Sequence, residues 1–413
     1  MTNRSDTSGA LEGLVVVELT TMLAGPFAGM LLSDQGARVI KIEPPGGEST
    51  RVVGPHPAGA IPPEDGGYGA YFASINRNKE SVTLDLKSPA GKDALRRIVA
   101  QSDVLLENFR AGVMERLDLS YESLAADNPK LVYAALRGFG DPRTGESPMV
   151  HWPAYDVVSQ AMGGLMAITG TTRGGPPTKV GPGVGDLIPA MQSVIGILAA
   201  VWRAGRTGQG QFVDVGMVDA VLSICERAIY QRSYTGAIAE PEGNGHPLLC
   251  PFGMYPAVDG HVAIGIPRDD FFALFASLIG RPELADDPNY AKNDARVARR
   301  DDVEAIVTNW TEARTKAEIA ATLGGKIPFG PIQTSADIIG SAHTAARQLL
   351  TELEHPGTNR TFSFVDTAIH LAGTPGGARN RAPLAGEHNQ AVLRDFGFSA
   401  DEMSDLKTND VIC

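Results

Sequence analysis

The chain has 413 residues, more than one compact core usually holds, so two or three domains are expected. Its composition, 43% hydrophobic and 20% charged, is that of a soluble globular protein. The formal net charge of -12 disfavours general nucleic-acid binding, because a phosphate backbone needs a basic face. A local basic pocket for a small phosphorylated ligand is compatible with this charge.

The compartment follows from the cysteines and the apolar stretches. The three cysteines, Cys225, Cys250 and Cys413, lie far apart without CxxC spacing, which fits a reducing compartment and predicts no disulfide framework. The start, "MTNRSDTSGALEG", is unlike a signal peptide, and no uninterrupted apolar stretch reaches the roughly 18 residues of a membrane span. We therefore expect a cytoplasmic protein without membrane contact.

Strands and helices are expected to alternate through the N-terminal third. The pattern opens with a βαβ unit, in which "LVVVEL" (14–19) and "ARVIKIE" (37–43) are strands around the helix "PFAGMLLSDQG" (26–36). A strand, a helix capped by Ser88 and two further strands follow at 81–86, 88–102, 103–108 and 131–138. This alternation is typical of an α/β fold with a doubly wound, Rossmann-like parallel sheet.

The rest of the chain divides into segments that differ in apolar spacing, glycine and proline content, and charge. An apolar stripe with helical spacing runs from Ile188 to Trp202 and predicts a long buried helix. From about residue 226, Gly/Pro-rich loops, a strand and charged helices take over. We expect a large domain in 1–225, a smaller α+β domain in 226–330, and a segment, 331–413, that returns to the large domain.

Several familiar motifs are absent. The first βαβ turn, "LTTMLAGPFAGM", lacks the GxGxxG of a dinucleotide site, although Glu43 ends the second strand, where an acid would hold a ribose. The eight histidines are dispersed, without HExxH or metal-ligand spacing, and no GxSxG occurs. We expect no bound metal.

Basic residues gather at two places. Lys87 ends "LDLK", and Arg110 and Arg116 lie in "ENFRAGVMERL". Both stretches fall near the carboxyl ends of expected strands, where open α/β sheets bind ligands. These side chains are either phosphate-binding groups or ordinary surface cations.

One aspartate stands alone after a glycine run. In "KVGPGVGDLIPAMQS" (179–193), Gly181, Gly183 and Gly185 precede Asp186. Glycines allow close backbone approach for a turn or a ligand. Asp186 is therefore either the N-cap of the long helix or a carboxylate that takes part in chemistry.

Five ordered blocks resemble the class III CoA-transferases, the family of the formyl-CoA and carnitine CoA-transferases. The blocks are "GLVVVELTTMLAGPFAGMLLSDQGARVIKIEPPGG", "NRNKESVTLDLKSPAGK", "SDVLLENFRAGVMERL", "RTGQGQFVDVGMVDAVL" and "RAPLAGEH". In that family the aspartate of the "GD" pair before a long helix is the nucleophile, which implies Asp186. The resemblance also implies an interlocked homodimer, a CoA thioester as substrate and no permanently bound cofactor.

The family's CoA-binding residues carry over by resemblance to nine positions. These are Leu23, Ala24, Leu84, Lys87, Asn108, Phe109, Arg110, Arg116 and Tyr155. Two departures put the formyl/oxalate substrate pair in doubt. Formyl-CoA transferase has a glutamine where this chain has Leu23, and its glycine-rich flap is not reproduced, although "EGNGHP" (242–247) is a candidate for an analogous loop.

A carboxylate can carry this chemistry without a general base, since an ordinary aspartate has a pKa of about 3.9 and is ionised at pH 7. Its attack on a thioester would give an aspartyl–acyl anhydride and CoA thiolate. The thiolate would then form an aspartyl-CoA thioester and free the donor acid, and an acceptor acid would reverse both steps. Backbone N–H groups of the glycine turn or helix start are candidate oxyanion donors.

Two other functions remain open. An α-methylacyl-CoA racemase needs acid and base groups on both faces of the α-carbon, and His151, four residues before Tyr155, could pair with Asp186. Racemases of this superfamily usually follow the aspartate with phenylalanine–glycine, however, and here Leu187 follows. A non-catalytic CoA-binding protein is the second alternative, which the presence of Asp186 disfavours.

The sequence does not define the acids that are exchanged. Dicarboxylate donors such as succinyl-CoA are common in the family. Arg51, Arg137 and Arg268 are candidates to hold a distal carboxylate, while Asp156 is expected to be a structural partner.

Overall fold

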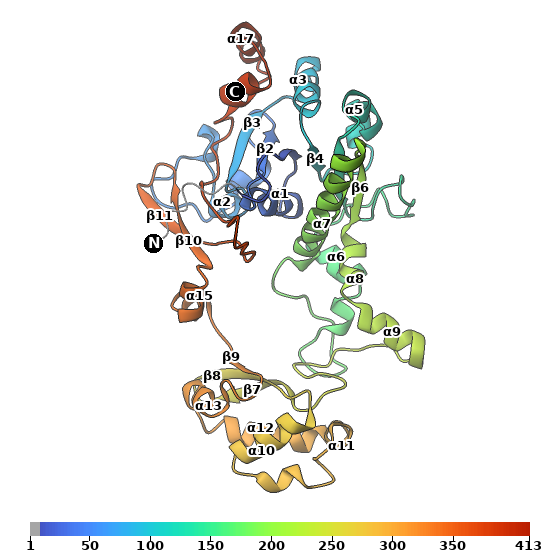
Figure 1. Ribbon diagram of the computed structural model, residues 1–413, viewed down its shortest axis with the longest axis vertical. Coiled ribbons are helices and arrows are strands. Elements are labelled where there is room, and N and C mark those ends of the chain that lie inside the picture. Colours follow the sequence, from blue (N-terminus) through green and yellow to red (C-terminus); the bar gives the residue numbers. More distant parts are fainter. Residues whose placement is uncertain (1–8) are drawn as a thin grey trace. The chain divides into compact units, whose positions relative to one another are not determined.

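The computed structural model describes residues 9–413, which divide into two compact units (Figure 1). The first unit comprises the chain as far as Leu165, together with Val180–Glu226 and His343–Cys413. The second comprises Met166–Lys179 and Arg227–Ala342. The chain therefore passes into the second unit twice.

The first unit is built on a six-stranded sheet in which each strand is parallel to its neighbours, in the order β3-β2-β1-β4-β5-β6. The strands are β1 (Val15–Leu19), β2 (Arg38–Glu43), β3 (Lys79–Thr83), β4 (Val104–Glu107), β5 (Val132–Arg137) and β6 (Gln211–Gly216). The expected α/β class with a parallel sheet is confirmed. Since β3 ends at Thr83, "LDLK" lies beyond the strand and not inside it.

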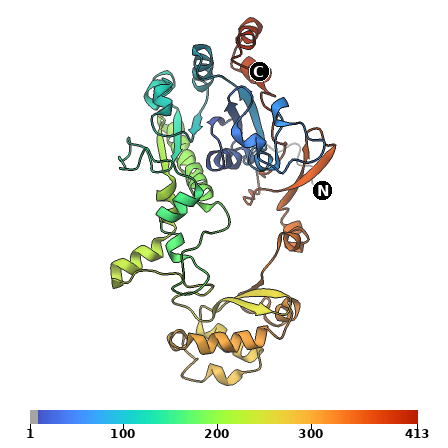
Figure 2. The same cartoon turned by 180° about the vertical axis from the view of Figure 1, so that it is seen from behind.

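Helices cover both faces of this sheet because successive strand side chains point in opposite directions. Val17 packs in one core with α3 (Pro89–Val99) and α16 (Asn389–Asp395). Val16 packs in the other core with α1 (Ala24–Asp34) and α7 (Val184–Thr207). The same helices can be followed from behind in Figure 2.

The C-terminal segment is bonded to the edge of the sheet. The Thr83 N–H donates to Asn389 Oδ1 at 2.9 Å, and the His388 N–H donates to the Ser81 carbonyl at 3.0 Å. The segment also carries the antiparallel hairpin of β10 (Leu350–His355) and β11 (Arg360–Val365), and α17 (Ala400–Thr408).

The second unit has its own core. An antiparallel sheet of β7 (Phe252–Ala257), β8 (Gly260–Gly265) and β9 (Phe329–Pro331) packs with α10 (Asp269–Leu278), α12 (Arg300–Thr311) and α13 (Lys316–Leu323). The other α-helices within residues 9–413 are α2 (Ala70–Ile75), α4 (Val113–Arg116), α5 (Tyr121–Asp127), α6 (Asp156–Met162), α8 (Met217–Ser223), α9 (Glu226–Thr235), α11 (Asn293–Ala298), α14 (Ser335–Ile339) and α15 (Ala342–Ala346).

The long helix α7 is apolar on two faces. Its buried face carries Ala190, Ser193, Ile197, Ala200 and Ala204 at helical spacing. Its other face is exposed in the single chain and carries Met191, Ile195, Leu198 and Trp202. By length and composition alone α7 could cross a membrane, but its first face packs on the sheet. The prediction of a buried helix is therefore right for only one face.

A buried ion cluster ties β1, β2 and β3 together. Glu18 receives Lys41 Nζ at 3.1 Å and Lys79 Nζ at 2.8 Å, and all three side chains are fully buried. Burial opposes ionisation of Glu18, but the two lysines hold the pKa of its carboxyl below the ordinary value. Gly29 of α1 makes room for the cluster, since a Cβ there would lie 1.9 Å from Glu18 Oε2.

We predict that Gly29→Ala destabilises the fold, although alanine normally favours a helix over glycine. The methyl group would displace Glu18 from its lysines, and breaking a buried ion pair costs about 3 kcal/mol or more. Gly373→Ala is the control, because a Cβ at Gly373 meets nothing within 4 Å. Equal free energies of unfolding for the two variants in urea would contradict this account.

Candidate active site

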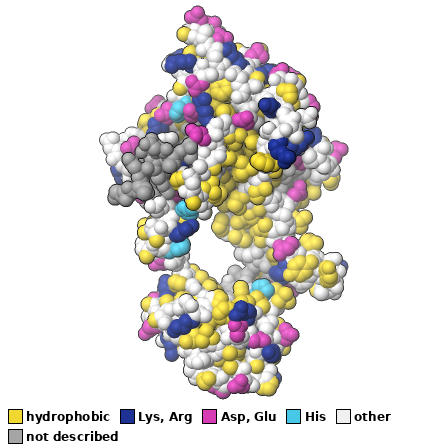
Figure 3. Space-filling view, viewed as in Figure 1, with side chains coloured by type: hydrophobic (Ala, Val, Ile, Leu, Met, Phe, Trp, Pro, Cys, Tyr) yellow, Lys and Arg dark blue, Asp and Glu magenta, His cyan; other side chains and the backbone are white. Residues whose placement is uncertain are grey.

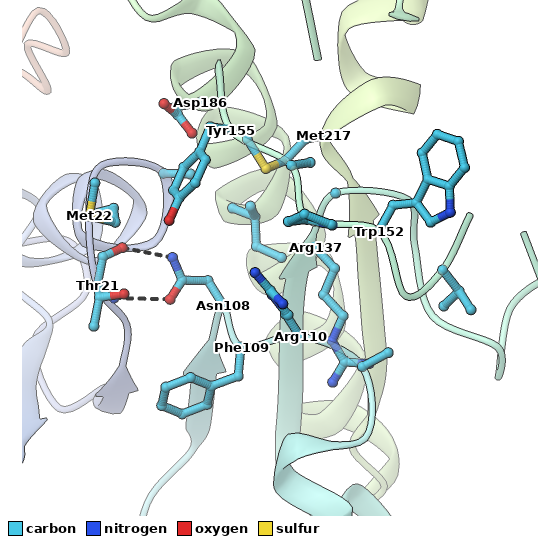
Figure 4. A pocket seen from close by; sticks show the side chains of 17 residues that line it. Thr21, Met22, Asn108, Phe109, Arg110, Arg137, Trp152, Tyr155, Asp186 and Met217 are labelled. Atoms are coloured by element: carbon cyan, nitrogen blue, oxygen red, sulfur yellow. Dashed lines mark hydrogen bonds between the residues drawn. The ribbon is translucent and has the colours of Figure 1, made fainter. Parts of the chain in front are cut away.

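The centre of the site is the point at which the sheet changes direction. β1 and β4 are neighbours, but the chain leaves them toward opposite edges of the sheet, which opens a crevice at their carboxyl ends. Asn108, just beyond β4, bridges this crevice: its Nδ2 donates to the Thr21 carbonyl at 2.8 Å, and its Oδ1 accepts from the Thr21 N–H at 2.9 Å (Figure 4). Met22, which follows Thr21, has a φ of 66°, a backbone conformation that is uncommon for methionine.

A cavity of about 220 Å³ lies at this crevice. Its walls come from the ends of β1, β4 and β5, from the segment before α6 and from the start of α7. The side chains labelled in Figure 4 are Thr21, Met22, Asn108, Phe109, Arg110, Arg137, Trp152, Tyr155, Asp186 and Met217. Asp186 is thus brought together with Ala24, Asn108, Phe109, Arg110 and Tyr155 of the predicted residues.

Asp186 is not the N-cap of α7, because Gly183 takes that position and Asp186 is the third residue of the helix. The glycines before it allow close contacts. A Cβ at Gly185 would lie 2.4 Å from the Asp156 carbonyl oxygen, and one at Gly183 would lie 3.0 Å from the Leu23 side chain. Leu23 therefore packs against the glycine loop and is not among the residues that line the cavity.

The amides at the start of α7 are already engaged. The Gly185 N–H donates to Asp156 Oδ1 at 2.9 Å, and the Asp186 and Leu187 N–H groups both donate to the Gly183 carbonyl, at 3.0 and 2.9 Å. These three groups are therefore not available to an oxyanion, contrary to the expectation for the helix start. Their hydrogen bonds instead hold the glycine-rich loop against the start of α7.

A second cavity of about 420 Å³ adjoins the first, since Thr21 and Phe109 line both. It lies at the carboxyl ends of β1, β2 and β3. Its lining is mainly apolar and includes Ile42, Leu84, Leu86, Phe109, Val113 and Leu117, with Lys87 and Arg116 also in its wall. Leu84, Lys87, Phe109 and Arg116 are thus brought together as predicted.

The exposed cations around the two cavities are Lys87, Arg110 and Arg116. Within residues 9–413, the structure shows no ion pair for any of the three. Two of the three acids that line the second cavity face buried cations: the Arg51 guanidinium binds both oxygens of Glu43 at 2.7 and 2.6 Å, and Lys41 Nζ lies 3.8 Å from Glu48 Oε1. The third acid is Asp85, so the wall of this cavity holds the cations Lys87 and Arg116 beside one acid without a salt bridge among the described residues.

Two of the arginines considered for a distal carboxylate have other partners. Arg51 is buried against Glu43 and lines neither cavity. The expectation that Arg51 could hold a distal carboxylate of the substrate is therefore wrong. Arg268 lies in the second unit and pairs with Asp270. Arg137 does line the first cavity, but it is held by Glu107 and Asp141, and burial raises the pKa of the Glu107 carboxyl despite Arg137.

Two further residues bear on the chemistry. His151, the candidate racemase base, is exposed and does not line the cavity that contains Asp186. Tyr71 of α2 was not predicted; burial and then the charge of Asp186 raise the pKa of its hydroxyl to about 12, so it stays protonated at neutral pH.

Sequence reasoning also missed Thr21, Met22, Trp152 and Met217. Thr21 could have been found, because it follows the expected first strand at its carboxyl end, where ligands bind. The other three carry no local signal of a site: they reach the cavity through the turn after β1, the loop before α6 and the start of α8.

A parallel sheet with two neighbouring cavities, a carboxylate and cations at its point of reversal is typical of a ligand-binding α/β protein. The sequence profile of CoA-transferase family III matches residues 11–389. The chain therefore belongs to this family and is an enzyme that transfers CoA between an acyl-CoA thioester and a carboxylic acid.

Individual relatives agree with this assignment. Succinyl-CoA:mesaconate CoA-transferase of Haloarcula hispanica is 41% identical over 389 residues, 94% of this chain and 97% of that protein. Acetyl-CoA:oxalate CoA-transferase of Acetobacter aceti is 38% identical over 394 residues, 94% of this chain and 96% of that protein. The crystal structure of a CaiB/BaiF family protein from Brucella suis matches with a TM-score of 0.82 at 33% identity, covering 95% of this chain and all of that one.

We predict that Asn108→Ala weakens the binding of CoA, measured by calorimetry, and lowers the free energy of unfolding by about 1–3 kcal/mol through the loss of two hydrogen bonds. Asn128→Ala is the control, because its amide is likewise hydrogen-bonded to the main chain, where its nitrogen donates to the carbonyls of Val99 and Ser102, but Asn128 lines neither cavity. It should lose stability alone. CoA affinity that is the same in both variants would show that the Thr21 bridge does not shape the site.

Proposed function

We propose that Asp186 is the nucleophile of this CoA-transferase. The observation that carries the proposal is that Asp186 lines a cavity that shares the lining residues Thr21 and Phe109 with a second cavity, whose wall contains Lys87 and Arg116. An acyl-CoA could place its thioester in the first cavity and its nucleotide in the second. No general base is needed, because a carboxylate is already a nucleophile when ionised.

The reaction proceeds in two exchanges. The Asp186 carboxylate attacks the thioester carbonyl and the C–S bond breaks. This step releases CoA thiolate and forms an aspartyl–acyl anhydride. The thiolate attacks the aspartyl carbonyl, which releases the donor acid and leaves an aspartyl-CoA thioester. The acceptor acid then attacks this thioester, and the same two steps run in reverse, so that CoA passes to the acceptor.

We assign the CoA nucleotide to the second cavity. The apolar walls formed by Leu84 and Phe109 suit an adenine ring, and the exposed Lys87 and Arg116 suit its phosphates. Tyr155, with Ala24 and Asn108, would then line the path of the pantetheine arm toward Asp186.

For the exchanged acids we propose dicarboxylates. Mesaconate and oxalate, which the two relatives' names give as their acceptors, are both dicarboxylic acids. Arg110 and Arg137 are the cations of the first cavity, and Arg110 has no acidic partner among residues 9–413. The Arg110 guanidinium is therefore the group best placed to receive a second carboxylate.

We further propose that the exposed face of α7 is covered by a second copy of the chain in an interlocked homodimer. Ile195 is 68% exposed and Trp202 70% exposed, and Figure 3 shows hydrophobic side chains gathered over this part of the first unit. A helix that is apolar on both faces is normally buried on both.

We place the enzyme in the cytoplasm, since Cys225, Cys250 and Cys413 form no disulfide.

The nucleophile can be tested by intact-protein mass spectrometry after incubation with succinyl-CoA and with monocarboxylic acyl-CoAs. We expect a CoA-sized, hydroxylamine-sensitive adduct on the wild-type chain, formed best from dicarboxylic thioesters and absent from Asp186→Ala. Asp219→Ala is the matched control, because Asp219 is also the third residue of its helix, α8, but does not line the cavity. An adduct that persists in Asp186→Ala would move the nucleophile elsewhere.

The dimer can be tested by sedimentation. We expect wild type at twice the mass of one chain, and Ile195→Asp as a monomer, because a charge on the apolar face would be buried without a partner. Val258→Asp alters a similarly exposed residue, at 65%, that belongs to the second unit and not to α7, and this variant should stay dimeric. A dimeric Ile195→Asp variant with wild-type circular dichroism would exclude this face as the interface.

A further inference from the structure

Gln160 is a fully buried glutamine that the proposed chemistry does not use. It lies on α6 and its side-chain amide is fully engaged with its surroundings. Oε1 accepts from the Val180 N–H at 3.0 Å, and Nε2 donates to Asp156 Oδ1 at 2.8 Å. The same nitrogen lies 3.5 Å from the Val180 carbonyl oxygen and 3.4 Å from that of Pro182.

The main chain that Gln160 holds is the approach to Asp186. Val180 is the residue at which the chain returns to the first unit after the excursion Met166–Lys179. Between Val180 and Asp186 stand Gly181, Gly183 and Gly185. Glycine has few conformational preferences of its own, so the path of this loop has to be set from outside.

α6 supplies the outside constraint at both ends of the loop. Gln160 binds Val180 at the beginning, and Asp156 accepts from the Gly185 N–H at 2.9 Å, immediately before Asp186. The two side chains are four residues apart, so they lie on one face of the helix, and they are hydrogen-bonded to each other. One short helix face thus serves as a template for the whole glycine loop.

We propose that Gln160 is a positioning residue for the reaction. It fixes the main chain at Val180 and orients Asp156, and through both it sets the direction in which the Asp186 carboxylate enters the cavity. The proposal rests on the nucleophilic role of Asp186 proposed above. Gln160 itself touches neither cavity, so its effect falls on the rate of attack and not on the binding of CoA.

The test is the single-turnover rate at which succinyl-CoA charges Asp186, followed by quenched intact-mass measurement. Gln160→Leu keeps the size of the side chain and removes every hydrogen bond. We expect the charging rate to fall by about 10- to 100-fold, as for other small misplacements of reacting groups, while the Kd for free CoA stays unchanged. An unchanged charging rate, or a fall in rate matched by an equal loss of CoA affinity, would overturn the proposal.

Gln35→Leu controls for the loss of a buried glutamine as such. Gln35 is buried, donates to Thr367 Oγ1 at 3.2 Å and does not line the cavity. It should lose thermal stability without a change in charging rate. A comparable fall in rate for Gln35→Leu would assign the effect of Gln160 to stability alone.

Gln160→Glu gives a readout that a merely structural role would not move. The new carboxyl keeps an acceptor for the Val180 N–H, but it can donate to Asp156 only when protonated. Burial beside Asp156 should raise its pKa above the ordinary glutamate value. The charging rate of Gln160→Glu relative to wild type should therefore recover as the pH falls through that pKa, and a ratio independent of pH would contradict the orienting role.

The failure of this inference can be told apart from that of the proposed nucleophile. A wild-type chain that charges while Gln160→Leu and Gln160→Glu charge equally well, at every pH, overturns the positioning role alone. A wild-type chain that forms no adduct with any acyl-CoA overturns both.

Discussion

Two hydrogen bonds between the Asn108 amide and the main chain of Thr21 join the strands at which the sheet reverses its direction of growth. The two cavities adjoin at the same point, where Thr21 lines both. A crevice at such a reversal is a consequence of topology alone, because neighbouring connections leave toward opposite edges. The Asn108 side chain adds a bridge across this crevice, which holds the turn that contains Met22. That turn leads into α1, whose first residue, Ala24, lines the same cavity as Met22.

Much of this could be predicted from the sequence because it depends on local patterns. Apolar runs bounded by glycine and proline gave the parallel strands, and the rule that ligands meet strand ends placed Lys87 and Arg116 near a site. The resemblance then singled out Asp186, for which the local sequence alone favoured a helix cap. The helix in fact begins at Val184, because glycine in the preceding loop lets the chain turn earlier.

The errors share a different cause, which is competition among partners that are distant in sequence. Arg51 looked available to a substrate, but Glu43 takes both ends of its guanidinium. The amides at the start of α7 looked available to an oxyanion, but Asp156 takes one and the loop carbonyls take others. Polarity alone does not reveal whether a donor is already satisfied, since that depends on where the fold brings its competitors.

The position of Asp186 also depends on two helices, α7 and α6. α7 carries the carboxylate and packs along the sheet, so it is rigid, whereas the loop before it is rich in glycine and has no stiffness of its own. α6 compensates, because Asp156 and Gln160 fasten the loop at its two ends. The proposed nucleophile is thus fixed by the helix that carries it and by side chains of a second helix that bind the loop before it.

The ion cluster of Glu18, Lys41 and Lys79 and the exposed pair Lys87 and Arg116 would respond differently to ionic strength. The cluster is fully buried, so dissolved ions screen it little, whereas exposed charges are screened beyond a Debye length of about 8 Å at physiological ionic strength. Concentrated salt should therefore affect the cluster little, while it weakens the phosphate binding proposed for Lys87 and Arg116. Under such conditions the apolar walls of the second cavity would carry most of the affinity for the nucleotide in its proposed place, because salt does not weaken the burial of apolar surface.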